Sequence, residues 1–137
     1  MLRPERTRGI ALLGAAMLLA VMAGCAAARL EDTHWYLTML GDTPMRGPTM
    51  ILYPKERRVS GSGGCNSFDG SYELDGDRLT FGPLASTRMA CPKGMDTEQA
   101  FHEAMGRVSG WKIEGQHLEL FDTAGVMVAR FEVWHPK

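Results

Sequence analysis

Three cysteines, Cys25, Cys65 and Cys91, are the side chains in this sequence with the widest choice of chemistry. A thiol can carry an acyl chain, form a disulfide, bind a metal ion or act as a nucleophile. A metal site usually needs four ligands, and the sequence has neither a CxxC pair nor cysteines and histidines at metal-binding spacing. Acylation and disulfide formation are therefore the two modifications that the sequence favours for these cysteines.

The first 24 residues predict a signal peptide. Three arginines precede an apolar run over residues 10–22, which is shorter than the roughly 20 residues that a membrane-spanning helix needs. A basic start followed by a short apolar run is typical of secretory signal peptides. Residues 1–24 are therefore left out of the fold, and the rest is expected to form one domain.

The end of the apolar run resembles a bacterial lipobox. It reads Met22-Ala23-Gly24-Cys25, with methionine where leucine is usual, and the resemblance implies that Cys25 is acylated. Two or more acyl chains anchor a protein stably to a membrane. Ala26, the next residue, resembles the outer-membrane sorting pattern. We expect a lipid-anchored protein of the bacterial cell envelope, at the outer membrane and facing the periplasm; secretion with a free Cys25 is the alternative.

If Cys25 carries lipid, Cys65 and Cys91 remain in an oxidising compartment, where disulfides form and persist. We expect a bond between them that closes a loop of about 27 residues and contributes on the order of 3–4 kcal/mol. Two buried free thiols and a functional thiol pair are the alternatives.

Arg88 is the charged residue whose surroundings stand out. It lies among apolar residues, shortly before Cys91. We expect a buried arginine paired with a carboxylate, because a buried charge needs a partner. Ligand binding by Arg88 is the alternative.

Familiar catalytic patterns are missing from the sequence. The four histidines are scattered without an HExxH motif, and Ser62 lies outside a GxSxG turn. The glycines of residues 61–64 could cradle phosphate only between a strand and a helix, whereas strands are expected on both sides. We expect a protein that is not an enzyme and that uses no metal and no cofactor.

The charge pattern excludes another class of partner. The formal net charge is −1, and both signs are interspersed along the chain. A nucleic-acid-binding surface needs a concentrated basic patch. We therefore expect no nucleic-acid partner.

Short apolar segments separated by turn residues predict a mainly β domain. Alternating side chains and intervening glycine, proline and aspartate residues are typical of antiparallel strands. Asp75-Gly76-Asp77 predicts a hairpin whose inward residues include Tyr72 and Leu79. The expected strands cover residues 34–40, 49–53, 58–61, 71–74, 78–81, 84–90, 111–113, 116–121 and 126–133.

One helix is expected near residues 96–108. Asp96 and Gln99 resemble a capping box, and Gly110 suits the exit. Apolar residues then recur at helical spacing, which favours a helix that covers the sheet; a partner-binding helix is the alternative. A bulge near Ala129 or Arg130 would let Phe131 and Val133 face the same side as Val126 and Val128; the alternative is that Phe131 and Val133 are core while Val126 and Val128 face a groove.

The expected organisation is a lipidated cysteine and tether over residues 25–32 and a domain over residues 33–137. Several short strands and one helix favour a small antiparallel β-barrel or rolled sheet with a packed helix.

Several segments resemble the META/HslJ family. They include Gly64-Cys65-Asn66 and residues 86–91, which read STRMAC, and the resemblance covers residues 33–133. It implies a compact β-rich domain with a packed helix, secreted or lipid-anchored in bacterial envelopes. Similar proteins are connected with heat shock, antibiotic tolerance, motility or secretion. The family brings no reaction and no catalytic residues.

These observations lead to two functional expectations. The first is a non-enzymatic envelope lipoprotein of stress tolerance that binds another envelope component through an exposed apolar patch. Methionines would supply adaptable contacts there, whereas core filling is expected to account for most of them. The alternative is a carrier that holds a small apolar ligand or an acyl chain inside the barrel.

Overall fold

The computed structural model describes residues 26–137, so the predicted signal peptide and Cys25 lie outside the described part. Within it, no helix has the length and apolar character needed to cross a bilayer. One helix and ten strands make up the fold. Their bounds are β1 Trp35–Leu40, β2 Thr43–Pro44, β3 Thr49–Tyr53, β4 Arg58–Ser62, β5 Ser67–Asp75, β6 Arg78–Phe81, β7 Ala85–Ser86, α1 Met95–Met105, β8 Gly110–Glu114, β9 His117–Phe121 and β10 Met127–Val133.

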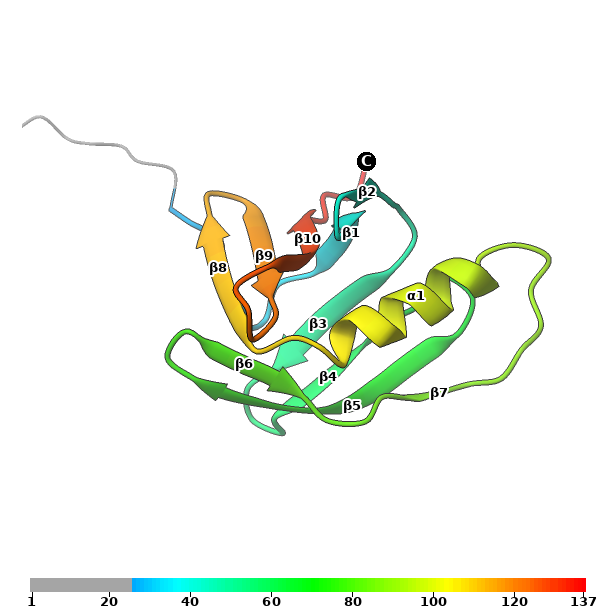
Figure 1. Ribbon diagram of the computed structural model, residues 1–137, viewed down its shortest axis with the longest axis horizontal. Coiled ribbons are helices and arrows are strands. Elements are labelled where there is room, and N and C mark those ends of the chain that lie inside the picture. The colour runs from blue at the N-terminus through cyan, green and yellow to red at the C-terminus, as the bar shows by residue number, and fades with distance from the viewer. Residues whose placement is uncertain (1–25) are drawn as a thin grey trace, which may run out of the picture.

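The strands form one antiparallel sheet that closes into a ring. Their order is β10-β9-β8-β6-β5-β4-β3-β1-β2, and a further pairing of β10 with β1 completes the circle (Figure 1). The seam between β6 and β8 rests on the residue pair Arg78–Gly110. The ring is therefore not a regular barrel, and it confirms the predicted rolled antiparallel sheet.

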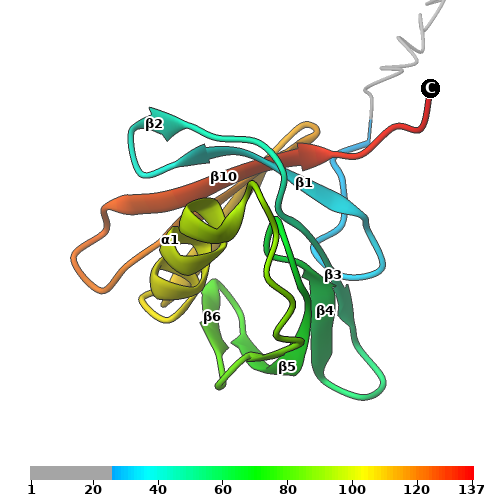
Figure 2. The same ribbon diagram turned by 90° about the vertical axis from the view of Figure 1, so that its right-hand side faces the viewer.

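Large side chains fill the inside of the ring. Trp35, Tyr72, Phe101 and Phe131 are among the bulkiest of the fully buried residues. The helix α1 packs against β1 and β10 (Figure 2) and places the Phe101 ring 6.4 Å from that of Phe131. The helix is thus a cover on the sheet, as its apolar spacing predicted.

The hairpin prediction is confirmed. Asp75 pairs with Arg78, which leaves Gly76 and Asp77 as a two-residue loop between β5 and β6. Tyr72 and Leu79 are buried, as expected, because alternate residues of a strand point to the same face. The predicted strand over residues 84–90 is wrong for most of its length, since β7 ends at Ser86.

A bulge interrupts β10, slightly earlier than predicted. Met127 pairs with Phe121 and Ala129 with Leu120, so Val128 is the extra residue. Val128 and Ala129 are both buried, although they are consecutive. The extra residue flips the facing pattern, which is why Phe131 then points into the core.

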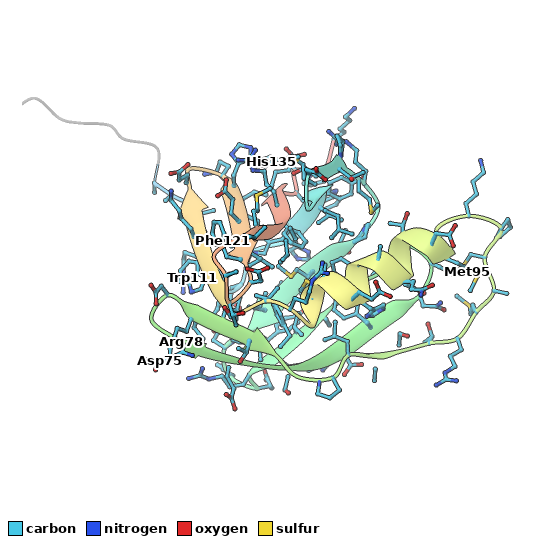
Figure 3. All side chains as sticks on the ribbon, in the orientation of Figure 1. Asp75, Arg78, Met95, Trp111, Phe121 and His135 are labelled. Carbon is cyan, nitrogen blue, oxygen red and sulfur yellow. A yellow bond between two sulfur atoms is a disulfide. The ribbon has the colours of Figure 1, made fainter. Side chains whose placement is uncertain are left out.

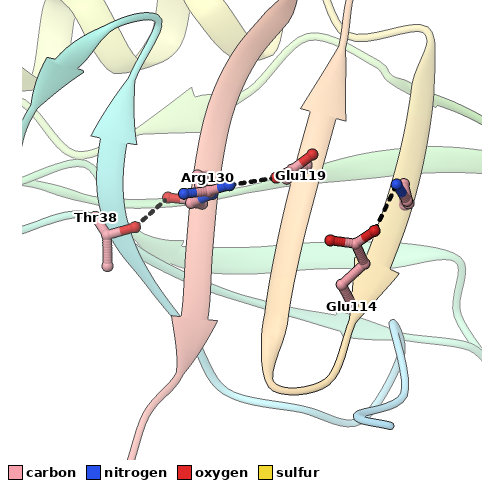
Figure 4. Close-up of polar contacts among 5 residues, drawn as sticks. Thr38, Glu114, Glu119 and Arg130 are labelled. Carbon is pink, nitrogen blue, oxygen red and sulfur yellow. Dashed lines mark hydrogen bonds and ion pairs between the residues drawn. The ribbon is translucent and has the colours of Figure 1, made fainter.

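A second bulge lies in β1, the other neighbour of β10. Thr38 is the extra residue there, because Leu37 pairs with Phe131 and Met39 with Arg130. The Thr38 hydroxyl donates to the Arg130 carbonyl at 3.2 Å, and the Arg130 guanidinium binds Glu119 at 2.5 Å (Figure 4). Bulges increase the local twist of a strand. The two bulges lie a few residues apart along the β1–β10 pair, where the ring closes.

The predicted tether is part of the domain. The Ala28 amide donates to the Gly115 carbonyl at 2.8 Å, and Leu30 is 5% exposed within the core. The Trp35 indole donates to the Leu30 carbonyl at 2.9 Å. The ordered domain therefore begins before residue 33, because Leu30, in the expected tether, is buried in the core next to Trp35 of β1.

The predicted helix cap is wrong. The N-cap is Gly94, with φ of 93°, and no side chain caps the helix; Gln99 instead donates to Glu103 at 3.4 Å. A Cβ on Gly94 would lie 2.9 Å from the Gly64 carbonyl oxygen, so close packing of two loops sets the helix start. The helix ends at Met105, with Gly106 as its C-cap, rather than near Gly110.

Candidate binding site at the disulfide-braced loop

Residues 87–94, called the braced loop below, connect β7 to α1. Cys91 in this loop is bonded to Cys65, which lies just before β5, and their Cα atoms are 5.9 Å apart. That separation is ordinary for a disulfide. The expected Cys65–Cys91 bond is therefore present, and the alternative of two free thiols is not.

The Asn66 side chain holds the braced loop through hydrogen bonds. This buried side chain accepts hydrogen bonds at Oδ1 from the Met89 amide at 2.7 Å and from the Thr87 hydroxyl at 3.0 Å. Its Nδ2 donates to Glu98 Oε2 at 2.8 Å. One amide side chain thus joins the entry to β5, the braced loop and the helix.

Glu98 is the charged partner of this arrangement. It is 8% exposed, and its Oε1 accepts the amide hydrogens of Asn66 at 2.6 Å and of Cys65 at 3.3 Å. Burial alone would raise the pKa of Glu98, but hydrogen bonds from the Asn66 side chain and from both amides outweigh burial and hold this pKa below its usual value. The carboxylate is therefore charged at neutral pH, and it binds Cys65 and Asn66, through which it supports the loop.

The glycine-rich segment makes room for this carboxylate. A Cβ on Gly63 would lie 2.7 Å from the Cγ of Glu98, a distance that real side chains do not adopt. The amides of Cys65 and Asn66 point at Glu98, which already supplies them with a negative charge. Within residues 61–64, the Gly63 amide donates to the Asn66 carbonyl at 2.9 Å and the Gly64 amide donates to the Ser62 hydroxyl at 3.2 Å, so neither is free for the phosphate of that alternative.

The expectation of a buried, paired Arg88 is wrong. Arg88 is exposed, and among residues 26–137 no carboxylate oxygen lies within 4.0 Å of its guanidinium. Apolar neighbours in sequence predict burial in a regular strand, whereas this loop is irregular. The buried charge near the disulfide is Glu98 instead.

Large apolar side chains surround Arg88 on the outer surface. Met89 is 60% exposed, and Met95, at the start of α1, is 48% exposed (Figure 3). We call Arg88, Met89 and Met95 the loop face. They border a shallow cavity of about 350 Å³, whose floor includes Asn66 and Glu98. The predicted methionine patch is therefore small, because Met50 and Met105 are buried in the core.

The other chemistry-bearing residues serve local packing. Ser62 Oγ accepts the Gly64 amide hydrogen at 3.2 Å within a turn. His102 packs edge-on against Phe68, with ring centroids 5.7 Å apart. In the described part of the chain, no three His, Cys, Asp or Glu side chains gather closely enough to hold a metal ion.

A partly buried hydrogen bond ties the N-terminal segment to β5. The Tyr72 hydroxyl donates to Glu31 Oε2. Burial, the hydrogen bond to Glu31 and the charge of Glu31 together raise the pKa of Tyr72 well above its usual value of 10. Folding therefore favours the neutral phenol.

This bond predicts a loss of stability in alkali. A group whose folded-state pKa is raised stabilises the fold below its unfolded pKa and loses that contribution as the pH rises above about 10. Tyr72→Phe should lower the free energy of unfolding by about 1.5–3 kcal/mol at pH 7 and flatten the decline above pH 10. Urea unfolding at pH 7, 9 and 11 measures both effects. Tyr53→Phe, at an exposed tyrosine, is the matched control, and a steep decline retained by Tyr72→Phe would contradict the assignment.

Comparisons with known proteins agree with this architecture. The META domain family matches residues 28–133. A protein from Burkholderia xenovorans solved by NMR is 30% identical, with a TM-score of 0.62 over 78% of this chain and 85% of that one. A DUF4847 family protein from Bacteroides vulgatus is 12% identical and shows the fold alone, with a TM-score of 0.58 over 79% of this chain and 96% of that one. A search of curated proteins found no match.

The structure is that of a small β-rich domain in which a disulfide and the Asn66–Glu98 contact lie at the loop before the helix. The match covers most of the chain, and it begins at Ala28, where the structure also finds the first residues packed on the domain. The chain belongs to the META domain family.

Proposed function

We propose that this META domain is a non-enzymatic envelope lipoprotein that binds another envelope protein through the loop face. The observation that carries the proposal is the 60% exposure of Met89 in a loop whose backbone is fixed by Asn66 and the disulfide. A soluble domain gains nothing by holding a large apolar side chain in water at a fixed position. Burial of this side chain under a partner would stabilise the complex.

The composition of the loop face suits a protein partner. Methionine and arginine are enriched in protein–protein interfaces, and methionine adapts its shape to the surface that it meets. The loop is also held in place before binding, so little conformational entropy is lost when a partner docks. A role in stress tolerance and an anchor at Cys25 are parts of this proposal that come from the sequence resemblances.

The packing of the ring argues against an apolar ligand in its interior. Trp35, Leu37 and Leu52 are 0% exposed and occupy the space that a ligand would need. A small barrel holds a ligand only where its inward side chains leave a cavity. The cavities beside Trp111 and beside Met89 both open at the surface of the described domain, which favours surface binding.

Site-specific photo-cross-linking in cells tests this function. A photoreactive residue replaces Met89 in the full-length chain, and the matched control carries it at Val126, which is 59% exposed in the turn between β9 and β10. We expect one defined cross-linked protein with the probe at position 89 and at least about tenfold less of it at position 126, because a photoreactive side chain labels only what it touches and an interface is centred on few residues. Equal labelling at both positions, or none at position 89, would refute the proposed face.

A further inference from the structure

An open groove of about 630 Å³ lies between the N-terminal segment and β8. Its apolar wall consists of Leu30, Leu74, Trp111 and Ile113, and Ala27 lies at its edge. Figure 3 places Trp111 at the opposite end of the molecule from Met95, so this groove is separate from the loop face. A pocket for a small molecule usually encloses most of its ligand, whereas this surface is open along its length.

The chain is fixed to the domain up to the edge of this groove. Gln116 Nε2 donates to the Ala26 carbonyl at 3.3 Å, and the Ala28 amide donates to the Gly115 carbonyl at 2.8 Å. The described residues therefore begin beside the turn between β8 and β9 (Figure 1). Cys25 is one peptide unit further, about 3.8 Å between Cα atoms. A lipid attached at Cys25 would therefore lie close in the chain to this groove.

The charges around the groove balance one another. Its lining contains the cations Arg29 and Lys112 and the anions Glu31 and Asp77. Lys112 also forms an ion pair with Glu114 at 2.6 Å. Balanced charges give little net attraction to anionic lipid headgroups, so apolar contact would dominate binding to a membrane surface.

Trp111 has the geometry of a side chain at a membrane interface. Its indole Nε1 donates to the Gly76 carbonyl at 2.9 Å, which satisfies the polar end of the ring. Its apolar face lines the groove next to Ile113. Such amphipathic rings are favoured where an apolar interior meets water.

We propose that this groove is a membrane-contact surface. Its occupant is the phospholipid surface to which Cys25 attaches the protein, with Trp111 and Ile113 at the boundary of headgroups and acyl chains. The inference rests on the proposed anchor at Cys25. The loop face, at the other end of the domain, then points away from the membrane toward a partner.

Fluorescence quenching by lipid tests this orientation. The acylated protein, purified from bacterial membranes, is reconstituted in phosphatidylcholine vesicles whose acyl chains carry bromine, a contact quencher of tryptophan. W134F removes an exposed tryptophan and leaves Trp111 and the buried Trp35. The double variant W111F/W134F leaves Trp35 alone as the control. The difference between the two variants reports Trp111.

We expect brominated lipid to reduce the Trp111 emission at least about twofold relative to unbrominated vesicles, because interfacial side chains enter the outer part of the acyl region. The emission of Trp35 should stay unchanged. A protein that is acylated at Cys25 by mass spectrometry but shows no quenching of Trp111 would overturn the contact surface and leave the anchor intact. A protein without lipid at Cys25 would overturn both.

Discussion

Replacing Asn66 with aspartate should lower the free energy of unfolding by about 3–5 kcal/mol at pH 7, the usual cost of a buried charge that loses its partner. The new carboxylate keeps the acceptor for Met89 and Thr87 but places a second oxygen 2.8 Å from Glu98 Oε2, where Asn66 now donates. Two carboxylates at this distance cannot both ionise at low cost.

The pH dependence makes this prediction specific. In the wild-type protein the pKa of Glu98 is lowered, so its stabilising contribution is present at neutral pH and is lost as the pH falls below the usual range of a glutamate. In Asn66→Asp, a shared proton would restore a hydrogen bond. The difference in stability between the two proteins should therefore shrink as the pH falls from 7 toward 4. Urea unfolding across this range measures it.

A neighbouring substitution provides the control for Asn66→Asp. Ser67 is exposed, and Ser67→Asp adds the same charge one residue away from the buried site. Exposed substitutions usually change stability by less than about 0.5 kcal/mol. If Asn66→Asp were as stable as Ser67→Asp at pH 7, Asn66 would not hold the charged carboxylate.

Removal of the disulfide should have the second large effect. Cys65→Ala combined with Cys91→Ala should lower the free energy of unfolding by about 3–4 kcal/mol, because the bond closes a loop of about 27 residues in the unfolded chain. The bonded cysteines lie on either side of the Asn66 contact to Met89. The substitution should therefore also loosen the braced loop in the folded protein.

Denaturation with and without reductant measures the contribution of the disulfide. A reductant should destabilise the wild-type protein by the same amount as the double substitution and leave the doubly substituted protein unchanged. A wild-type protein that loses less than about 1 kcal/mol on complete reduction would contradict a bracing role, since disulfides of this loop length typically contribute more.

The strand pattern was readable from the sequence because burial on one face produces alternation. Trp35 and Leu37 in β1 and Leu118 and Leu120 in β9 alternate in this way, and all four are buried. The bulge at Val128 was also predictable in kind, since the alternation of β10 changes phase there. Its position was not, because the partner strands determine which residue is left unpaired.

The Asn66–Glu98 contact was missed, although the sequence carries a signal for half of it. Glu98 precedes Phe101 by three residues and Met105 by seven, the spacing of residues on one helix face. A glutamate on the buried face of a helix predicts a buried carboxylate that needs donors. The capping-box pattern pointed to Asp96 and Gln99, whereas Glu98 is the residue of this helical turn that binds Asn66.

The prediction that Arg88 is buried was wrong for a related reason. In a strand or a helix, neighbours at a known period reveal which side chains are buried, but the braced loop has no period. Its conformation depends on donors and acceptors that come from β5 and α1. Such long-range contacts are not visible in the local sequence.

Amide hydrogen exchange of Met89, followed by NMR, most directly tests whether Asn66 holds the braced loop in one conformation. The Met89 amide donates to Asn66 Oδ1 at 2.7 Å, whereas the described part of the chain offers the neighbouring Ala90 amide no partner. We expect Met89 to exchange at least about tenfold more slowly than Ala90, and Asn66→Ala to abolish the difference. Equal, fast exchange at both positions in the wild-type protein would contradict a loop fixed in advance for its partner.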